Sequence, residues 1–309
     1  MNINSKLLLL GVATFASLQV SAQHDSPGAA KTPFINKADM DVSVKPGNDF
    51  YQYASGTWIK NNPVPAKETR WGSFNKLRDF NINAVKTLVT TAAANKKAAP
   101  GSVEKRVGDF YAAGMDSIAI EKAGATPIKA DLEKINAVKT STDVLSQAAY
   151  MRTAGIGSPM FGFFVGQDRK NVEVMIPQLS QGGTTLPDRD YYLKDDSRSQ
   201  KIREAYKNYM VKLFTLSGVP AETAEKNAET VFNIEKAMAE AQMSRVEMRD
   251  PQKTYNKFAV ADLTKTTPAI DWKTLMTQMK VTGQDTVLVN SPAFFAKLNS
   301  LLTTTPVND

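Results

Sequence analysis

The sequence has no cysteine and a single histidine, His24. Without thiols it has no disulfide framework and no cysteine nucleophile. Zinc endopeptidases hold their metal with two histidines at positions i and i+4 of one helix, because that spacing puts both imidazoles on the same face. One histidine cannot supply that pair, so the sequence predicts no metal site in this chain. A Ser-His-Asp triad would also depend on His24, and no G-x-S-x-G motif is present.

Charge and nucleotide-binding motifs exclude further classes of function. The chain carries 38 basic and 31 acidic residues, a net charge of +7. The charges are interspersed, without a block of about five or six like charges, so the pattern predicts no binding to nucleic acid. The sequence also has no G-x-x-x-x-G-K-[ST] phosphate loop, no G-x-G-x-x-G fingerprint and no EF-hand loop.

Long apolar runs are absent except at the start of the chain. There, residues Leu7 to Val20 are apolar, a lysine precedes them, and residues 20–22 form a small-residue cleavage site. This pattern predicts a signal peptide over residues 1–22 and a periplasmic or secreted protein without a membrane anchor after cleavage. A single transmembrane anchor is the competing interpretation, but the run is shorter than the roughly 20 residues of a span. Residues 23–43 are predicted to be a flexible lead-in.

Most of the remaining chain has the hydrophobic periodicity of helices. Apolar residues recur at every third or fourth position, which indicates helices that pack through one face. Proline, glycine or a capping residue marks the ends of these segments. The predicted helices run from residue 73 or 75 to the Ala-rich sequence before Pro100, from 102, from 126, from 141 to 152, from 197 to 216, from 221 to about 248, and from 291 to 301.

A different pattern begins at Gly155. Two short segments, Pro159 to Val165 and Val172 to Pro177, are apolar or alternating, and the residues between them are turn formers. This arrangement predicts a β-hairpin. We therefore expect a mainly α fold, a multi-helix domain over residues 44–309 with one small β-hairpin at about 159–177.

Aromatic residues are concentrated in one segment, from Pro46 to Arg78. It reads PGNDFYQYASGTWIKNNPVPAKETRWGSFNKLR, whereas aromatics make up only 8% of the whole chain. Aromatic side chains bury a large area each, so this segment is predicted to anchor the core. Asn48 and Asp49 are candidate helix caps, and Pro63 and Pro65 predict an extended connector before the next helix.

The same segment resembles the opening of the N-terminal domain of the neprilysin-like (M13) zinc metalloendopeptidases. Members of that family begin with a P-x-x-DF-x-x-Y-x-x-G-x-W block, then a Pro-containing turn and an R-[YW]-G-x-F block, and this chain has both in order. Two later patches agree with the family, LPDRDYY at residues 186–192 and RDP at 249–251 followed by YN at 255–256. The resemblance covers residues 44 to 309.

The resemblance implies an N-terminal half that encloses the substrate and does not hold the metal. The zinc-binding H-E-x-x-H and E-x-x-x-D motifs of the family lie in a C-terminal catalytic domain, and this sequence stops at Asp309. The chain is expected to be inactive alone and to hold no cofactor, although full-length members bind zinc. Its expected partners are small peptides and an M13 catalytic domain, in cis or in trans. A lone half is expected to leave an apolar face exposed.

The resemblance also implies three substrate contacts. In relatives, the arginine of the R-[YW]-G-x-F block binds the peptide carboxylate, and Arg70 is the matching residue. A guanidinium suits this role because its planar fork pairs with both carboxylate oxygens. An acid and an arginine on the next helix line the same subsite, and here they are Asn75 and Arg78, so an amide replaces the acid. From the residues alone, the alternative is a surface arginine that stacks on Trp71.

Two other functions stay open at this stage. A peptide-binding or interaction protein without a catalytic half would use Arg70 and Arg78 beside the aromatic cluster. A carboxylate-only hydrolase would need a buried pair of acids, for which Asp188 and Asp190 are candidates. The structural alternative for this pair is that Arg189, which lies between them, neutralises both carboxylates.

Overall fold

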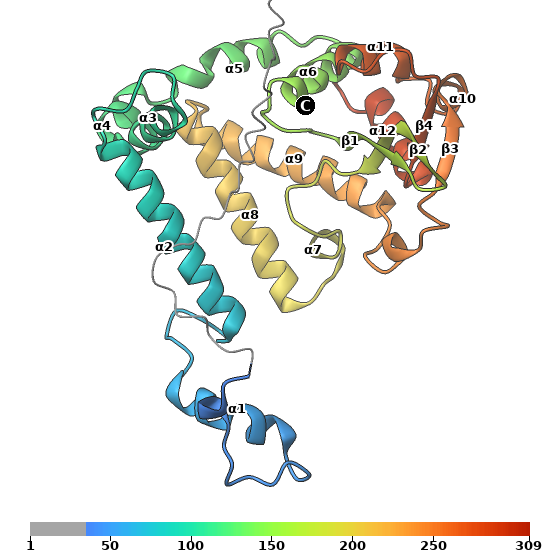
Figure 1. The fold of residues 1–309 in the computed structure, drawn as a ribbon. Coiled ribbons are helices and arrows are strands. Elements are labelled where there is room, and N and C mark those ends of the chain that lie inside the picture. Colours follow the sequence, from blue (N-terminus) through green and yellow to red (C-terminus); the bar gives the residue numbers. More distant parts are fainter. Residues whose placement is uncertain (1–34) are drawn as a thin grey trace, which may run out of the picture. The chain divides into compact units, whose positions relative to one another are not determined.

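The computed structural model describes residues 35–309, which fall into two compact units. Unit 1 ends at Asp116, and unit 2 runs from Ser117 to Asp309. The predicted signal peptide, His24 and residues 23–34 of the predicted lead-in lie outside the described residues. Figure 1 labels the helices and strands of both units.

Helices account for most of the described residues, which confirms the prediction of a mainly α fold. The elements of unit 1 are η1 (Lys37–Asp39), α1 (Phe50–Asn61), α2 (Ser73–Ala94) and α3 (Val103–Met115). The helices of unit 2 are α4 (Ser117–Ala123), η2 (Thr126–Ile128), α5 (Lys129–Asn136), α6 (Ser141–Thr153), α7 (Asp190–Leu193), α8 (Ser197–Leu216), α9 (Ala221–Ala241), η3 (Glu247–Arg249), α10 (Val260–Thr266), α11 (Trp272–Gln278) and α12 (Pro292–Thr304). The strands of unit 2 are β1 (Phe161–Asp168), β2 (Asn171–Gln181), β3 (Asn256–Ala259) and β4 (Thr286–Val289).

Helix α1 begins where the sequence predicts a cap. The Asp49 carboxylate accepts a hydrogen bond from the backbone N–H of Gln52 at 2.9 Å, so one of the free N–H groups of the first turn is satisfied. The segment before α1 packs on it, because the Thr57 hydroxyl donates to the carbonyl of Met40 at 2.8 Å. Residues 36–41, part of the predicted lead-in, therefore contact α1.

Helices α2 and α3 pack against each other at a glycine. A Cβ built on Gly108 of α3 would lie 2.5 Å from the carbonyl oxygen of Ala92 in α2, so only glycine permits this approach of the two backbones. Gly56 and Gly108 are the buried positions among the described residues of unit 1. Unit 1 thus has close helix contacts but no buried apolar side chain in its described part.

The prediction that the aromatic segment anchors a core was wrong. Phe74 is 87% exposed, Phe50 69% and Tyr51 70%. Apolar side chains further along α2 are exposed as well, namely Leu77, Phe80, Ile82, Val85 and Leu88. Large side chains bury area only where other elements cover them, and within residues 35–116 no other element covers this face.

A four-stranded sheet in the order β1-β2-β4-β3 organises unit 2. β1 and β2 form the predicted hairpin, which the structure extends to residues 161–181. β2 pairs in parallel with β4, where Leu179 faces Val289, and β4 pairs antiparallel with β3, where Asn256 faces Val289. The sequence predicted the hairpin but not β3 and β4.

The main core of unit 2 lies between this sheet and helices α6, α9, α10, α11 and α12. Phe161, Trp272 and Phe295 meet edge to face, with ring centroids 5.6 to 5.9 Å apart. Trp272 is fully buried, and its Nε1 donates to the Thr267 hydroxyl at 2.8 Å, so the polar edge of the ring is satisfied. This arrangement fixes α11 and α12 against the first strand.

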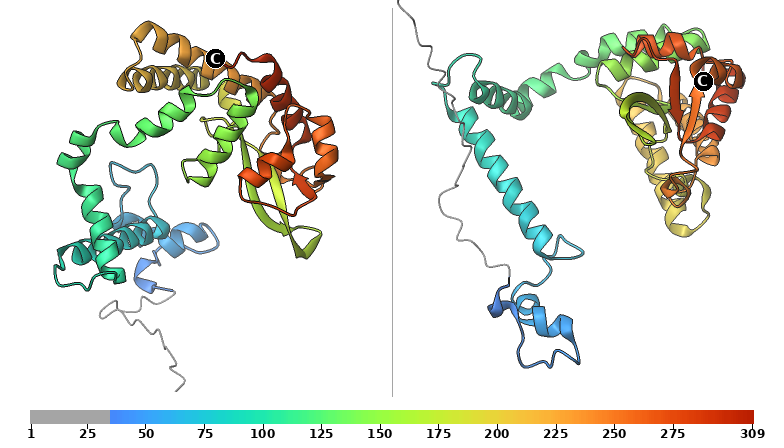
Figure 2. Two further views of the ribbon diagram at one scale, coloured as in Figure 1. Left: turned by 90° about the horizontal axis from the view of Figure 1, so that it is seen from above. Right: turned by 45° about the vertical axis from the view of Figure 1, so that its right-hand side comes forward.

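Helices α7, α8 and α9 enclose a second cluster, which contains a buried carboxylate. α8 and α9 run side by side in opposite directions (Figures 1 and 2), and they pack on Tyr192 of α7. Glu235 of α9 is 6% exposed, and its two oxygens accept from the hydroxyls of Tyr192 at 2.7 Å and Tyr206 at 2.9 Å. They also accept from the backbone N–H and the hydroxyl of Thr185, at 3.1 and 2.8 Å. Four donors therefore hold this carboxylate.

Helix α9 ends at Ala241, seven residues before the predicted end near residue 248. The backbone groups of the residues that follow it bond to side chains and do not continue the helix. The amide of Gln181 accepts from the backbone N–H of Met243 at 2.8 Å and donates to the carbonyl of the same residue at 2.9 Å. Ser244 and Glu247 then cap a separate turn, with the Glu247 carboxylate accepting from the Ser244 N–H at 2.9 Å. The chain leaves the helix here and passes beside the end of β2.

Candidate functional site

The residues that the sequence implies as substrate contacts lie at the start of α2, in unit 1. The connector from α1 turns at Pro65, whose carbonyl accepts from the N–H of Glu68 at 2.8 Å, and α2 then begins after Gly72. Beside this junction lies a cavity of about 750 Å³. Its lining includes the aromatic residues Phe50, Tyr51, Tyr53, Trp58 and Trp71. The exposed aromatic segment thus surrounds a hollow of the size of a small-molecule or peptide side-chain site.

Arg70 directly precedes the part of the connector that lines this cavity. Its side chain is exposed and makes no hydrogen bond or ion pair with any residue in the described part of the chain. It also does not stack on Trp71, since the ring contacted by a cation in this region is Trp58, with Lys76 Nζ 6.0 Å from its centroid. The N–H donors of the Arg70 guanidinium thus have no partner among residues 35–309.

Arg78, by contrast, already has two carboxylate partners. Its Nη2 lies 2.6 Å from Glu68 Oε1 and 2.8 Å from Asp79 Oδ1, and its Nε donates to the same Asp79 oxygen at 3.0 Å. The hydrogen bonds to Glu68 and then Asp79 raise the pKa of Arg78 above its ordinary value. These contacts tie the connector to the first turns of α2, and they leave Nη1 as the nitrogen without a partner in the described residues.

Asn75 lies three residues before Arg78, so both side chains lie on one face of α2. It is half-buried, its backbone N–H donates to the carbonyl of Gly72 at 3.1 Å, and its side-chain amide has no hydrogen bond in the region that the structure describes. The structure thus brings Arg70, Asn75 and Arg78 to one helix entry. No hydrogen bond joins the three side chains.

The contacts of Asp188 and Asp190 do not support the alternative of a carboxylate-only hydrolase. Asp188 pairs with Nε of Arg245, and Asp190 pairs with Nζ of Lys194 at 2.8 Å. Arg189 does not neutralise them, since its Nη1 donates to the carbonyl of Gln242. Each acid therefore pairs with a different cation. The alternative that Arg189 neutralises both was also wrong, because Arg189 turns toward the end of α9.

Within residues 35–309, no three His, Cys, Asp or Glu side chains lie together as a candidate metal site. The donors present do not fit zinc, and no chemical step in this chain is assigned to a metal. None of the helices in this same range is long and apolar enough to cross a membrane.

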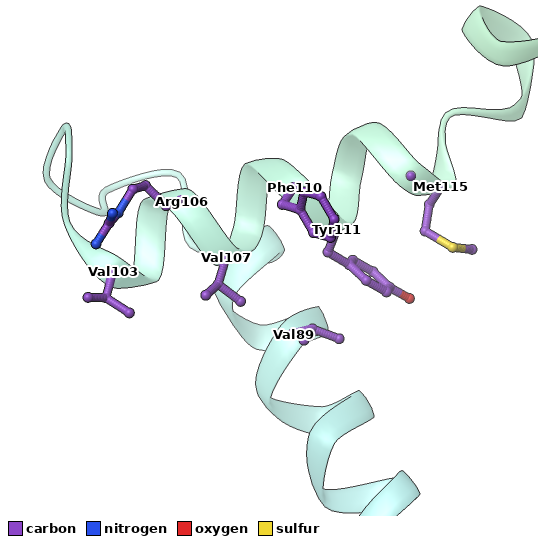
Figure 3. A pocket seen from close by; sticks show the side chains of 8 residues that line it. Val89, Val103, Arg106, Val107, Phe110, Tyr111 and Met115 are labelled. Atoms are coloured by element: carbon purple, nitrogen blue, oxygen red, sulfur yellow. The ribbon is translucent and has the colours of Figure 1, made fainter. Parts of the chain in front are cut away.

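An apolar groove in unit 1 was not recognised as a site from the sequence. It has a volume of about 520 Å³ and lies between the end of α2 and the length of α3. Val103, Val107 and Tyr111 follow one another along α3, and Val89 lies beneath them on α2 (Figure 3). Val103, Val107, Phe110 and Tyr111 recur at the three- and four-residue spacing of one helix face. The helix is present, and that face is the wall of the groove.

Comparison with known proteins identifies the class. A model of peptidase family M13 matches residues 46–309, which is most of the chain, and the chain belongs to this family. The junction described above, with Arg70 before α2, lies within the matched residues.

Particular relatives cover the same part. Human endothelin-converting enzyme 1 is 30% identical over 314 residues, which span 95% of this chain and 40% of the relative. Neprilysin-3 of Drosophila melanogaster is 28% identical over 305 residues, 91% of this chain and 38% of the relative. The crystal structure of the Mycobacterium tuberculosis zinc metalloprotease ZMP1 with an inhibitor has a TM-score of 0.78 and 26% identity, over 89% of this chain and 42% of that one. The chain thus spans about two fifths of the length of the proteins it matches.

Proposed function

We propose that this chain is the substrate-enclosing N-terminal part of an exported zinc endopeptidase of family M13. In this proposal it binds the terminal carboxylate of small peptides through Arg70. The observation that carries the proposal is the exposed Arg70, which has no partner in the described residues and directly precedes Trp71 in the wall of a cavity of about 750 Å³ with aromatic walls. A peptide with a hydrophobic residue beside a free carboxylate matches both features.

The three residues take different parts in this proposal. Arg70 supplies a bidentate pair to the carboxylate, which is stronger and more directional than a single hydrogen bond. Arg78 offers its remaining Nη1, while Glu68 and Asp79 hold its guanidinium in place. Asn75 contributes a neutral amide where relatives carry an acid, so it does not repel the carboxylate of the peptide.

Peptide hydrolysis itself is assigned to residues outside these 309. M13 relatives are named as converting enzymes, neprilysins or zinc metalloproteases, and this chain matches about two fifths of each. We propose that a C-terminal catalytic domain, in cis or in trans, supplies the zinc ligands and covers exposed apolar faces such as that of α2. Leu77, Phe80 and Leu88 of α2 are each more than half exposed, and a large exposed apolar patch marks a partner surface. The predicted signal peptide would direct the protein to the periplasm or the medium.

Calorimetry with short hydrophobic peptides tests the carboxylate contact. Peptides with a free C-terminus should bind at least about ten-fold more tightly than the same peptides with an amidated C-terminus, because a hydrogen bond to a charged group contributes about 1.5–3 kcal/mol. Arg70→Gln should remove this difference, while Arg198→Gln, which changes an exposed arginine of α8, should preserve it. If amidation makes no difference for the wild-type chain, the carboxylate contact is refuted.

One alternative shares the same binding site, namely a peptide-binding protein without a catalytic half. The coding sequence that follows the codon for Asp309 separates the two. An in-frame H-E-x-x-H motif supports the peptidase, and a stop codon at that point supports the binding protein.

A further inference from the structure

A second polar cavity lies in unit 2, where the end of α9 passes beside the end of β2. It has a volume of about 330 Å³. Its walls come from the end of β2, the loop before α7, and the turn that contains η3. The charged residues of its lining are Asp188, Arg189, Arg245 and Arg249. Three guanidinium groups and one carboxylate therefore face the same small space.

Each arginine is held in a different way. Arg189 is half-buried, and its Nη1 donates to the carbonyl of Gln242, which leaves its other N–H groups without a partner in the described residues. Arg245 pairs through Nε with Asp188. Arg249 is exposed, and within the part of the chain that the structure describes its side chain makes no hydrogen bond or ion pair. A backbone carbonyl thus holds Arg189 and a carboxylate holds Arg245, whereas Arg249 has no partner among the described residues.

The charges around the cavity do not balance. Asp188 is the only carboxylate in the lining, and its side chain is 13% exposed and already pairs with Arg245. The carboxylate of Glu247 accepts hydrogen bonds from the N–H and the hydroxyl of Ser244. These two bonds are the main cause of its lowered pKa, and the charge of Arg189 contributes less. Like charges around one cavity repel each other, and the repulsion is relieved when an anion enters.

The sequence patches LPDRDYY and RDP supply two of these arginines, Arg189 and Arg249, and the proposed peptide-carboxylate contact uses neither of them. The arginine fork suits a planar or tetrahedral oxyanion, since it offers two parallel N–H donors to two oxygens. We propose that this cavity binds a compact oxyanion, either free phosphate or the side-chain carboxylate of an acidic peptide, between Arg189, Arg245 and Arg249. This proposal does not depend on Arg70 or on the peptidase activity.

Isothermal titration of the 309-residue chain, at constant ionic strength set with chloride, tests the proposal. The titrants are inorganic phosphate, a short peptide with blocked ends and one glutamate, and the same peptide with glutamine in its place. Constant ionic strength separates a bound anion from general screening. We expect saturable binding of phosphate or of the glutamate peptide, and none of the glutamine peptide.

Two substitutions of equal charge change decide whether the cavity is responsible. Arg249→Gln removes the arginine that no described residue holds, so it should leave the fold intact and weaken binding at least about ten-fold. Arg198→Gln, on the exposed start of α8, should leave binding unchanged. Saturation by phosphate alone identifies free oxyanions as the ligand, and saturation by the glutamate peptide identifies acidic peptides. If neither titrant saturates, or if both variants bind like the wild type, the proposal is overturned. Arg70→Gln should leave oxyanion binding unchanged. A failure of the oxyanion site can therefore be distinguished from a failure of the peptide-carboxylate contact.

Discussion

Replacing Glu235 with leucine should loosen the segment that joins β2 to α8. Leucine has a similar volume but no acceptor, and the carboxylate of Glu235 accepts from Thr185, Tyr192 and Tyr206. The hydroxyl of Tyr192 also accepts from the backbone N–H of Leu186 at 2.9 Å, so the same network positions the loop backbone. Removing the side chain of Glu235 therefore affects the loop and also α7 and α8, which carry Tyr192 and Tyr206.

The magnitude follows from the donors that would be left buried. Tyr192 is 2% exposed and Tyr206 7%, so neither hydroxyl reaches water in place of the lost oxygen. A buried donor without a partner costs about 1–3 kcal/mol, and removing the desolvated carboxylate offsets part of that cost. We expect a net loss of about 2–4 kcal/mol. Glu235→Gln retains the shape and one oxygen, and should cost about 1 kcal/mol.

Hydrogen exchange followed by mass spectrometry measures this loss locally. The amides of Thr185 and Leu186 both donate into the network. In a peptide that spans them, a loss of 2–4 kcal/mol corresponds to exchange about 30-fold to 700-fold faster. Glu229→Gln on the same helix is the matched control. It breaks only an exposed ion pair with Lys207, for which we expect less than about 1 kcal/mol.

Two results bear on the reasoning. If Glu235→Leu exchanges no faster than Glu229→Gln, the buried carboxylate does not hold the loop and the account of this network is refuted. A double variant, with Tyr206→Phe added to Glu235→Leu, should be more stable than Glu235→Leu alone. It removes the buried hydroxyl of Tyr206 together with its acceptor, and replacing both partners by apolar groups is close to neutral.

Three further predictions concern stability measured by urea unfolding. Hydrogen bonds, of which the one from the backbone N–H of Lys170 has the largest effect, lower the pKa of Asp168 from 3.8 to about 2. The stability that this carboxylate contributes is therefore present above pH 4 and is lost as the pH falls toward 2. Asp168→Asn should flatten this acid-side fall in stability, and an unchanged fall would contradict the prediction. Gly183→Ala should cost about 1–3 kcal/mol, because Gly183 has φ +72° and a Cβ would lie 2.6 Å from the Met160 backbone; a neutral result would contradict the reported contact. Glu68→Gln should cost less than about 1 kcal/mol, because its ion pair is partly exposed, and a loss above about 2 kcal/mol would show that the pair is a structural anchor.

Helices with strong periodicity were predictable from the sequence. α8, α12 and the start of α9 lie where apolar residues recur at helical spacing between clear start and stop residues. The hairpin was predictable because its two strands are adjacent in the chain. β3 and β4 have four residues each, and β4 pairs with β2, more than 100 residues away. A segment of that length has no periodicity of its own, and its pairing depends on the tertiary fold.

The candidate site was predictable only in part. The R-[YW]-G-x-F block identifies Arg70, but the sequence does not reveal that Arg70 is unpaired while Arg78 is held by Glu68, because that pair depends on the turn at Pro65. The arginine-lined cavity could not be predicted either. Its lining residues come from segments far apart in the chain, and only the early end of α9 brings them together.

We propose that this chain binds peptides and that the metal that cleaves them is held outside it. The most direct test incubates the purified 309-residue chain with a hydrophobic peptide and zinc, with and without a chelator, and follows cleavage by mass spectrometry. We expect an intact peptide in both samples. Cleavage that depends on the protein and stops with the chelator would contradict it.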